Sequence, residues 1–437
     1  MNITIVQTFT DGFTTYQSGQ ELSVPSEVAQ RWIADGTAQA DTDGQQSWLS
    51  STEVAATRSL VSGDWKDITN PTALRAWRRR RALATPSGAF SRPAVVAFVG
   101  DSIVYGVQSN GSATETSGPN ADGTYLGDVS WPEMAARIAN ARMGAVTPTV
   151  WHPQDARLTA SNTTSVSSVG LAGSSRQVTS TGPGSIVTPT VAQRRFEVGY
   201  YETTTANSDT ASGGFSIAVD GGAATNIPTA GASRVGKIAT SAVLAAGSHY
   251  LTVTGITSAP AYITHLMGYT DGGIAVTRVG RGGWTLGDML GLQANNSVSA
   301  SGQGRLLSGF AQSAWHDMLL IECVHNDPTQ YDLVQYSAYI DAVIAACPAT
   351  MPIGLIAPPY PPTGQESAVY GVRTDYWDVM KSKAVEGSNV WHARAGSAFG
   401  AYADAYAAGL YAGASTVHPS TAGYGLLGQW LADLLTC

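Results

Sequence analysis

The chain has 437 residues, of which 24 are Lys or Arg and 32 are Asp or Glu, so its formal charge is 24 − 32 = −8. Charged residues make up only 13% of the chain, about half of the roughly 25% typical of globular proteins, whereas 43% hydrophobic residues exclude a disordered tail. The acidic balance argues against a nucleic-acid partner, because no broad excess of Lys and Arg is available to displace counterions from phosphates. The length predicts two or three domains.

Neither a membrane span nor a secretion signal is expected. No apolar stretch approaches the ~20 residues that a membrane helix needs, and the first residues lack a basic start followed by an apolar core. Three widely spaced cysteines, Cys323, Cys347 and Cys437, predict free thiols made in a reducing cytoplasm rather than a disulfide framework or a zinc site. The low charge and the many Gly, Ser and Thr residues are nevertheless typical of proteins that act outside cells.

The first elements belong to a small N-terminal module, residues 1–50. Short strands are expected around residues 3–5 and 13–16, a helix over 26–34 and a linker over 45–51. A helix over 71–84 follows, with Asn70 as its cap and Pro71 in its first turn. The arginines at 78–81 predict a solvated helix face rather than an anion-binding site.

From Ala94 onward, strands and helices alternate. The continuous apolar run 94–99 is typical of a strand that is covered on both faces. Ser130 and Glu133 form a capping-box pattern at the start of a helix. Such alternation predicts parallel β-α-β units. The expected strands are 94–99, 273–279, 318–323, 352–357 and 389–392, and the expected helices are 130–143, 286–292, 337–347, 372–385 and 421–435.

Residues 155–272 interrupt this alternation. They are rich in Ser, Thr and Gly, and apolar residues alternate with a period of two at Phe215, Ile217 and Val219 before an Asp220-Gly221 turn signal. We therefore expect an all-β sandwich inserted into an α/β domain. The expected division is an N-terminal module (1–50), the first part of the α/β domain (60–154), the insertion (155–272) and the second part of the α/β domain (273–437).

Two motifs point to nucleophilic catalysis. Gly100-Asp101-Ser102 follows the first buried strand, at the sheet edge where parallel α/β folds bind ligands. His418 precedes the last helix, and an imidazole near neutral pH can take the proton of a serine hydroxyl. Each motif alone has an ordinary explanation, a turn for Ser102 and a surface loop for His418. Together they predict a nucleophile and its base.

Four blocks at strand ends and helix starts resemble the motifs of the SGNH hydrolases, also called GDSL-type esterases. The resemblance covers about residues 70–150 and 273–437. It implies a three-layer, flavodoxin-like α/β domain with a parallel sheet, and an esterase that needs no metal and no cofactor. The blocks are Gly100-Asp101-Ser102-Ile103, Gly282-Gly283-Trp284-Thr285, Val324-His325-Asn326-Asp327 and His418-Pro419-Ser420-Thr421-Ala422-Gly423-Tyr424.

The resemblance also implies roles for individual residues. Ser102 would be the nucleophile and His418 the base. The oxyanion would be bound by the backbone N–H groups of Ser102 and Gly283 and by the side chain of Asn326. Three residues close to the blocks are expected to bind the substrate, whether this is a sugar or an acyl chain: Asp101, Tyr105 and Trp284.

Two positions depart from the family pattern. An Asp usually stands three residues before the histidine, but this chain has Ser415 there. Either Ser102 and His418 form a dyad oriented by a carbonyl or hydroxyl group, or a carboxylate from elsewhere completes a triad, with Asp404 as the nearest candidate. In the third block Val324 replaces the usual Gly.

The inserted region resembles the jelly-roll sandwiches that accompany carbohydrate-active enzymes; a packing or oligomerisation domain is the structural alternative. The resemblance therefore implies an esterase that removes O-acetyl groups from a polysaccharide. The N-terminal segment is similar to short modules of bacteriophage structural proteins, which predicts a virion-associated protein made in the host cytoplasm and acting outside cells. Tail components or a second copy would then be its partners. The alternatives are a lipid or short-chain acyl esterase and a non-catalytic, glycan-binding tail protein.

Overall fold

The computed structural model describes most of residues 68–436 and, before them, only the backbone of five short strands. Within 68–436 the description omits residues 87–89, 107–129, 154, 156, 168–173, 182–183, 203–212, 232–235, 281–282, 291–315, 323–324, 363–364 and 366.

The N-terminal strands form two small antiparallel sheets. One has the order β4-β1-β5, and the other is the β2–β3 pair. Strands occur in both places expected from the sequence, whereas the expected helix over 26–34 and the linker over 45–51 lie outside the described residues. The bounds are β1 Asn2–Ile5, β2 Phe9–Thr10, β3 Thr15–Tyr16, β4 Glu21–Ser23 and β5 Ala38–Ala40.

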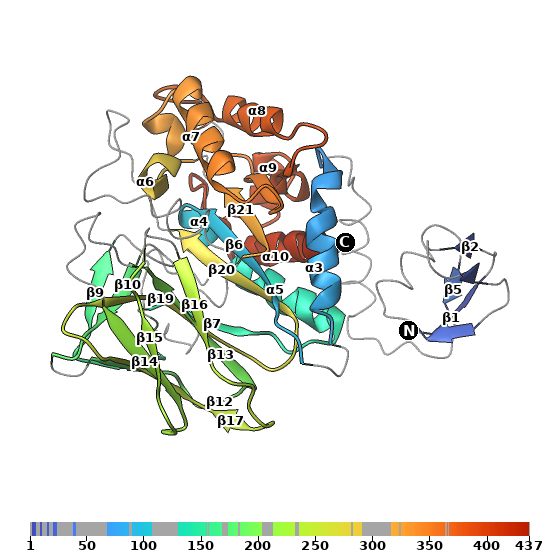
Figure 1. Ribbon diagram of the computed structural model, residues 1–437. Coiled ribbons are helices and arrows are strands. Elements are labelled where there is room, and N and C mark those ends of the chain that lie inside the picture. Colours follow the sequence, from blue (N-terminus) through green and yellow to red (C-terminus); the bar gives the residue numbers. More distant parts are fainter. Residues whose placement is uncertain are drawn as a thin grey trace.

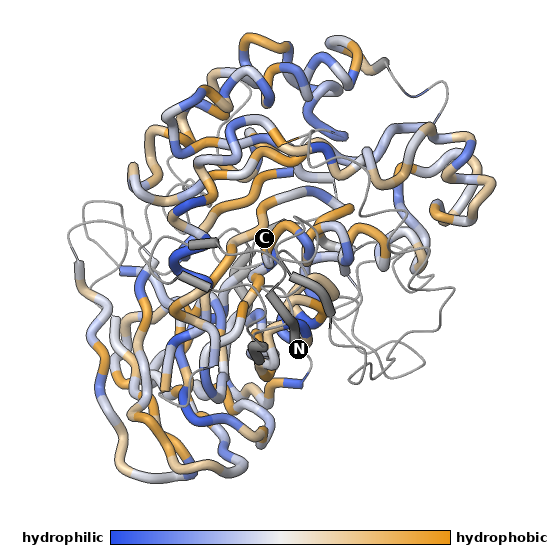
Figure 2. Tube along the Cα trace, turned by 90° about the vertical axis from the view of Figure 1, so that its right-hand side faces the viewer, coloured by the Kyte–Doolittle hydropathy of each residue, from blue (hydrophilic) through white to orange (hydrophobic). Residues whose placement is uncertain are grey.

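A five-stranded parallel sheet in the order β20-β6-β21-β22-β25 forms the centre of the α/β part. All five strands were expected from their short apolar runs, and every residue of β6 is buried, as a strand covered on both faces requires. Hydrophobic stretches accordingly run through the middle of this part in Figure 2. The bounds are β6 Ala94–Gly100, β20 Ile274–Gly280, β21 Met318–Glu322, β22 Ile353–Ala357 and β25 Val390–Arg394.

Helices cover both faces of this sheet, and alternate residues of each strand point to opposite helix layers. Val95 of β6 packs in one cluster with Tyr336 of α7, whereas Phe98 packs in the other with Trp131 of α5 and Leu427 of α10. Figure 1 shows α6, α7 and α8 together, away from α5 and α10. The bounds are α3 Arg75–Leu83, α4 Ser102–Tyr105, α5 Trp131–Met143, α6 Leu286–Leu290, α7 Leu333–Ala346, α8 Arg373–Lys383, α9 Tyr402–Ala407 and α10 Thr421–Thr436.

Helix ends differ from the sequence expectation in three places. The helix expected from residue 337 begins at Leu333, because the Asp332 side chain accepts a hydrogen bond from the Gln335 N–H. Ser130 is the N-cap of α5 but makes no side-chain capping bond. Asn70 does not cap its helix either: it has a φ of 55°, and its side chain donates to the carbonyl oxygens of Val385 and Val390.

The inserted region is a sandwich of two antiparallel sheets. One sheet has the order β16-β13-β19-β10-β9 with β7 also paired to β19, and the other has the order β15-β14-β18-β11-β8. Phe196, Phe215 and Val253 pack in the core between them. The bounds are β7 Thr149–Trp151, β8 Thr159–Ser161, β9 Thr164–Ser167, β10 Ser174–Val178, β11 Ser185–Val187, β12 Val191–Ala192, β13 Arg195–Tyr201, β14 Gly214–Val219, β15 Thr225–Pro228, β16 Gly236–Thr240, β17 Ser248–His249, β18 Leu251–Gly255 and β19 Ala261–Tyr269.

The edges of the insertion follow from these strands. β7 ends at Trp151, before the expected start at residue 155, and already belongs to the sandwich. β19 ends at Tyr269 and β20 begins at Ile274, on either side of the expected end at residue 272. The turn expected at Asp220-Gly221 joins β14 to β15, with φ values of 51° and 68° at its two central residues. Both positive values are those of a type I′ hairpin turn.

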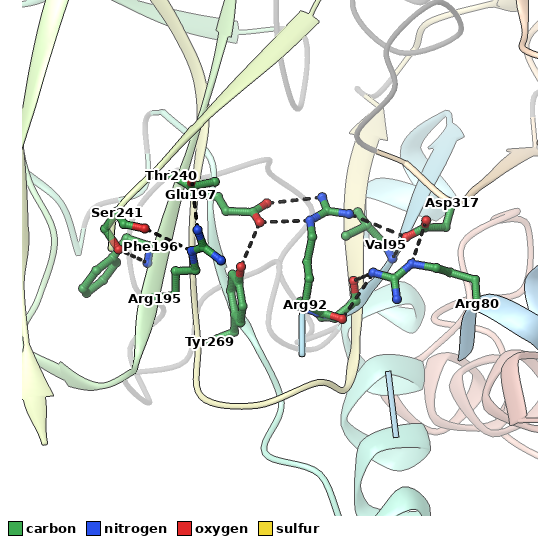
Figure 3. Close-up of polar contacts among 11 residues, drawn as sticks. Arg80, Arg92, Val95, Arg195, Phe196, Glu197, Thr240, Ser241, Tyr269 and Asp317 are labelled. Atoms are coloured by element: carbon green, nitrogen blue, oxygen red, sulfur yellow. Dashed lines mark hydrogen bonds and ion pairs between the residues drawn. The ribbon is translucent and has the colours of Figure 1, made fainter. Parts of the chain in front are cut away.

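A partly buried ionic network joins the sandwich to the α/β part (Figure 3). Arg92, just before β6, forms a bidentate pair with Glu197 of β13, with distances of 2.9 and 3.2 Å. Glu197 is only 1% exposed and also accepts a hydrogen bond of 2.9 Å from the Tyr269 hydroxyl. On the other side, Asp317 pairs with Arg80 of α3 at 2.9 Å. At least one of the arginines at 78–81 therefore holds the fold together rather than facing solvent.

Two smaller findings concern the membrane-span and cysteine predictions. Within the described residues, no helix has both the length and the apolar character needed to span a membrane. Cys347 is buried with a free thiol, and burial raises its pKa to about 12. The other two cysteines lie outside the described residues.

Candidate active site

Ser102 is the first residue of α4 and stands at the carboxyl end of β6. The turn between them is tight: a Cβ atom on Gly100 would lie 2.1 Å from Cγ2 of Val104 and 2.7 Å from the carbonyl oxygen of Glu322. Only glycine fits there, which explains the residue before Asp101 in the first block. The half-buried Ser102 thus sits at the sheet edge where open α/β sheets bind ligands.

His418 meets Ser102 at this edge, although 316 residues separate them in sequence. Nε2 of His418 lies 2.7 Å from the Ser102 hydroxyl oxygen, a hydrogen-bond distance. Burial lowers the pKa of His418, so the imidazole is neutral near neutral pH and Nε2 can accept a proton. The two residues that the sequence singled out as nucleophile and base are therefore in contact.

The other ring nitrogen of His418 contacts a threonine. Oγ1 of Thr416 lies 3.2 Å from Nδ1 and also accepts a hydrogen bond of 3.1 Å from the His418 backbone N–H. A tautomer with its proton on Nδ1 donates to this oxygen and leaves Nε2 free for Ser102.

Neither residue proposed from sequence as a third member takes this place. Asp404 is exposed on α9, and no ion pair or hydrogen bond joins it to His418. The exposed Ser415 contributes its carbonyl oxygen to a bond with Gln365 instead. In the structure the group next to Nδ1 is the Thr416 hydroxyl and not a carboxylate.

The three expected oxyanion donors follow three adjacent strands. Ser102 comes after β6, Gly283 after β20 and Asn326 after β21, and Gly100 of β6 is in register with Gly280 on one side and Glu322 on the other. The donors consequently lie at the same edge of the sheet, with Ser102 on the central strand of the three. Gly283 has a φ of 78°, which a residue with a side chain rarely adopts.

The second and third blocks are tied to each other. The Asn326 side-chain amide donates to the carbonyl oxygen of Trp284 at 3.0 Å, and the Leu286 backbone N–H donates to Oδ1 of Asp327 at 2.9 Å. These bonds fix the orientation of Asn326 and of the loop that carries Gly283. They also give the buried Asp327 a structural role.

Asp101, which was expected from the sequence to bind the substrate, points into the protein. Its side chain is fully buried, and Oδ1 accepts a hydrogen bond of 2.9 Å from the Ile103 N–H at the start of α4. Asp101 thus shapes the turn that presents Ser102 and has no exposed surface to offer a ligand. Trp284, within the second block, is half-buried, whereas the side chain of Tyr105 lies outside the described residues.

Three buried carboxyl groups lie close to Ser102: those of Asp101, Glu322 and Asp327. Burial raises the pKa of Asp101 to about 7. The hydrogen bonds from the Ile103 and His325 N–H groups and the charge of Arg373 lower this pKa, but burial has the larger effect. Burial, reinforced by the charges of Asp101 and Asp327, raises the pKa of Glu322 well above its ordinary value, and burial does the same for Asp327. A protonated Glu322 adds no negative charge behind Ser102, where it would oppose a developing oxyanion.

Within the described parts of the chain, no group of three or more His, Cys, Asp or Glu residues is arranged to hold a metal ion. Sequence reasoning missed Thr416, although it is a hydroxyl residue two positions before the histidine. It also missed Arg373 and Gln365, which contact the loops around the site through backbone carbonyl groups and carry no local motif.

Comparison with known proteins supports the fold. No protein-family model matches the chain, and no curated protein matches it. A solved peptidoglycan O-acetylesterase aligns with a TM-score of 0.56 and 16% identity over 84% of this chain and 97% of that chain. A family two carbohydrate esterase from Cellvibrio japonicus aligns with a TM-score of 0.26 and 10% identity over 66% of this chain and 97% of that chain.

A family 35 carbohydrate binding module from Clostridium thermocellum also aligns, with a TM-score of 0.23 and 16% identity over 28% of this chain and 98% of that chain. Of these three similarities, the one at 0.56 is high enough to show a shared fold. The expected fold class, a three-layer α/β domain with a parallel sheet interrupted by an all-β insertion, is confirmed.

Proposed function

We propose that this protein is a serine esterase that removes O-acetyl groups from a polysaccharide. The observation that carries the proposal is the 2.7 Å contact between the Ser102 hydroxyl and Nε2 of His418 at the carboxyl edge of a parallel sheet. The fold shared with a peptidoglycan O-acetylesterase supports acetyl-ester chemistry on a glycan. The β-sandwich next to the catalytic domain agrees with a polymeric substrate.

The reaction proceeds in two steps. His418 takes the proton of the Ser102 hydroxyl as its oxygen attacks the ester carbonyl, and the tetrahedral oxyanion is bound by Ser102 N–H, Gly283 N–H and the Asn326 amide. The intermediate then collapses: the bond between the carbonyl carbon and the sugar oxygen breaks, and His418 donates the proton to that oxygen, so the sugar leaves with a free hydroxyl and an acetyl group stays on Ser102. Water attacks this acyl-enzyme with His418 again as base, and acetate is released.

Thr416 takes the orienting position of a triad carboxylate but supplies no negative charge. Its hydroxyl holds the His418 ring in the productive tautomer, whereas a carboxylate would in addition stabilise the imidazolium that forms during attack. The catalytic group is therefore a Ser–His dyad in which a hydroxyl group orients the histidine. We expect slower acylation than in enzymes that have a carboxylate at this position.

Two esterase assays test the substrate class. Acetate release from O-acetylated bacterial polysaccharides is compared with release of fatty acid from long-chain acyl esters. The proposal predicts activity on the acetylated glycans and little on long chains. The reverse preference would favour the alternative of a lipid esterase.

Association with a virion stays a prediction from the N-terminal segment, as do action outside the cell and assembly with tail components or with a second copy. Light scattering on the purified chain measures the oligomeric state. Mass spectrometry of purified virions from the source tests for the protein itself.

A further inference from the structure

The loop that carries Asn326 is held by an arginine from another element. Arg373 is the first residue of α8, and its Nε and Nη2 donate to the carbonyl oxygen of His325 at 3.3 and 3.2 Å. His325 directly precedes Asn326, so the guanidinium group fixes the backbone next to the oxyanion donor. Because Arg373 uses two nitrogens on one carbonyl oxygen, a lysine could not reproduce this contact.

The same arginine reaches toward the histidine loop. Nη1 of Arg373 donates to the carbonyl oxygen of Gln365, and the Gln365 side-chain amide donates to the carbonyl oxygen of Ser415 at 2.9 Å. Ser415 directly precedes Thr416, whose hydroxyl contacts His418. Three successive contacts thus lead from the oxyanion loop through Arg373 and Gln365 to the loop of the base.

The segment between the two residues is itself fixed. Strands β23 (Ser367–Ala368) and β24 (Gly371–Val372) form a hairpin that joins Gln365 to Arg373. The Tyr370 N–H donates to the carbonyl oxygen of Pro328 at 2.9 Å, two residues beyond Asn326. The hairpin is therefore anchored to the oxyanion loop in its turn, through Tyr370, and directly after its second strand, through Arg373. Gln365 extends from this anchored unit to the histidine loop.

We propose that Arg373 and Gln365 are positioning residues that hold the His418 loop in register with the Asn326 loop. This inference rests on the proposed function, because register between base and oxyanion donor matters only if both act on one ester. In an enzyme with a triad carboxylate, that side chain helps to orient the histidine ring. Here the orienting group is a neutral hydroxyl, so the backbone that carries Thr416 must be held more firmly, and the bond from Gln365 to Ser415 does this.

The test replaces Gln365 by Met, which keeps the length of the side chain and removes its donor. On p-nitrophenyl acetate we expect kcat to fall about five- to tenfold, the effect of about one hydrogen bond, with KM changed by less than about twofold. Arg373→Lys should behave alike. Lys383→Gln is the matched control: Lys383 lies at the other end of α8, and the substitution removes its ion pair with the exposed Asp341 of α7, so kcat should stay unchanged.

A double-mutant cycle separates positioning from general stability. Gln365→Met combined with Thr416→Val should lose less activity than the product of the single losses, because both residues orient the same ring. The positioning role would be overturned if Gln365→Met kept the wild-type kcat, or if its kcat fell only in step with its melting temperature. An inactive Ser102→Ala variant would show that the proposed function still holds in that case. Full activity in Ser102→Ala would instead contradict the proposed function itself.

Discussion

Removing the hydroxyl of Thr416 isolates the part of the site that departs most from a Ser-His-Asp triad. Thr416→Val keeps the shape of the side chain and deletes two hydrogen bonds that the hydroxyl oxygen accepts, one from Nδ1–H of His418 at 3.2 Å and one from the His418 backbone N–H at 3.1 Å. A neutral hydrogen bond is worth about 1 kcal/mol net, so one to two such bonds correspond to a fall in kcat of roughly 5- to 30-fold. This is far below the ~10⁴-fold effect of losing the orienting carboxylate of a triad.

The assay is steady-state hydrolysis of p-nitrophenyl acetate, with Thr416→Ser as the matched control. The serine variant keeps the hydroxyl and should stay within about threefold of wild type, since it loses only the methyl contact. Thermal melts of both variants check that the fold is intact. Wild-type kcat in Thr416→Val would refute a role for the hydroxyl. A ~10⁴-fold loss would show that Thr416 does more than orient a neutral ring.

Three further predictions follow from the charges of the fold and the site. Because burial lowers the pKa of His418, the acidic limb of the kcat/KM profile should have its midpoint below 6.5, and a midpoint above 7 would indicate an undetected carboxylate partner. Folding raises the pKa of the Glu322 carboxyl, so this group contributes stability below pH 4.5, its ordinary pKa, and the contribution is lost as the pH rises. In urea unfolding, the stability of Glu322→Gln relative to wild type should therefore be greater at pH 8 than at pH 4. Arg92→Ala leaves Glu197 buried without its ion pair and should lower the free energy of unfolding by roughly 3 kcal/mol in the same assay, whereas no change would show that the network in Figure 3 is dispensable.

The central sheet could be predicted because its strands are short apolar runs, and such runs leave few alternatives to a buried strand. α9 was missed, since its alanine- and tyrosine-rich sequence carries no capping residue and no apolar period. Asn70 shows a different reason for error. Its side chain looks like a local cap, but it bonds carbonyl groups more than 300 residues away, and only the folded chain brings these together.

The candidate site, too, could be predicted from the sequence only in part. Ser102 and His418 were recognisable because each stands in a motif with fixed neighbours. For Asp101 the motif left the direction of the side chain open: a carboxylate beside the expected nucleophile suggests a ligand contact, whereas here it turns inward to cap α4. The partner of Nδ1 depends on how the loop before His418 folds, and neither residue type nor spacing distinguishes Thr416 from Ser415 or Asp404.

The most direct test of the central claim is acetate release from an O-acetylated polysaccharide by the wild-type chain and by Ser102→Ala. Both proteins are compared at equal concentration, with thermal melts to show that the variant is folded. Hydrolysis by the wild type and background release by Ser102→Ala is the predicted result. Equal release by both proteins, or none above background by the wild type on any acetyl ester, would contradict the assignment of Ser102 as the nucleophile of an esterase.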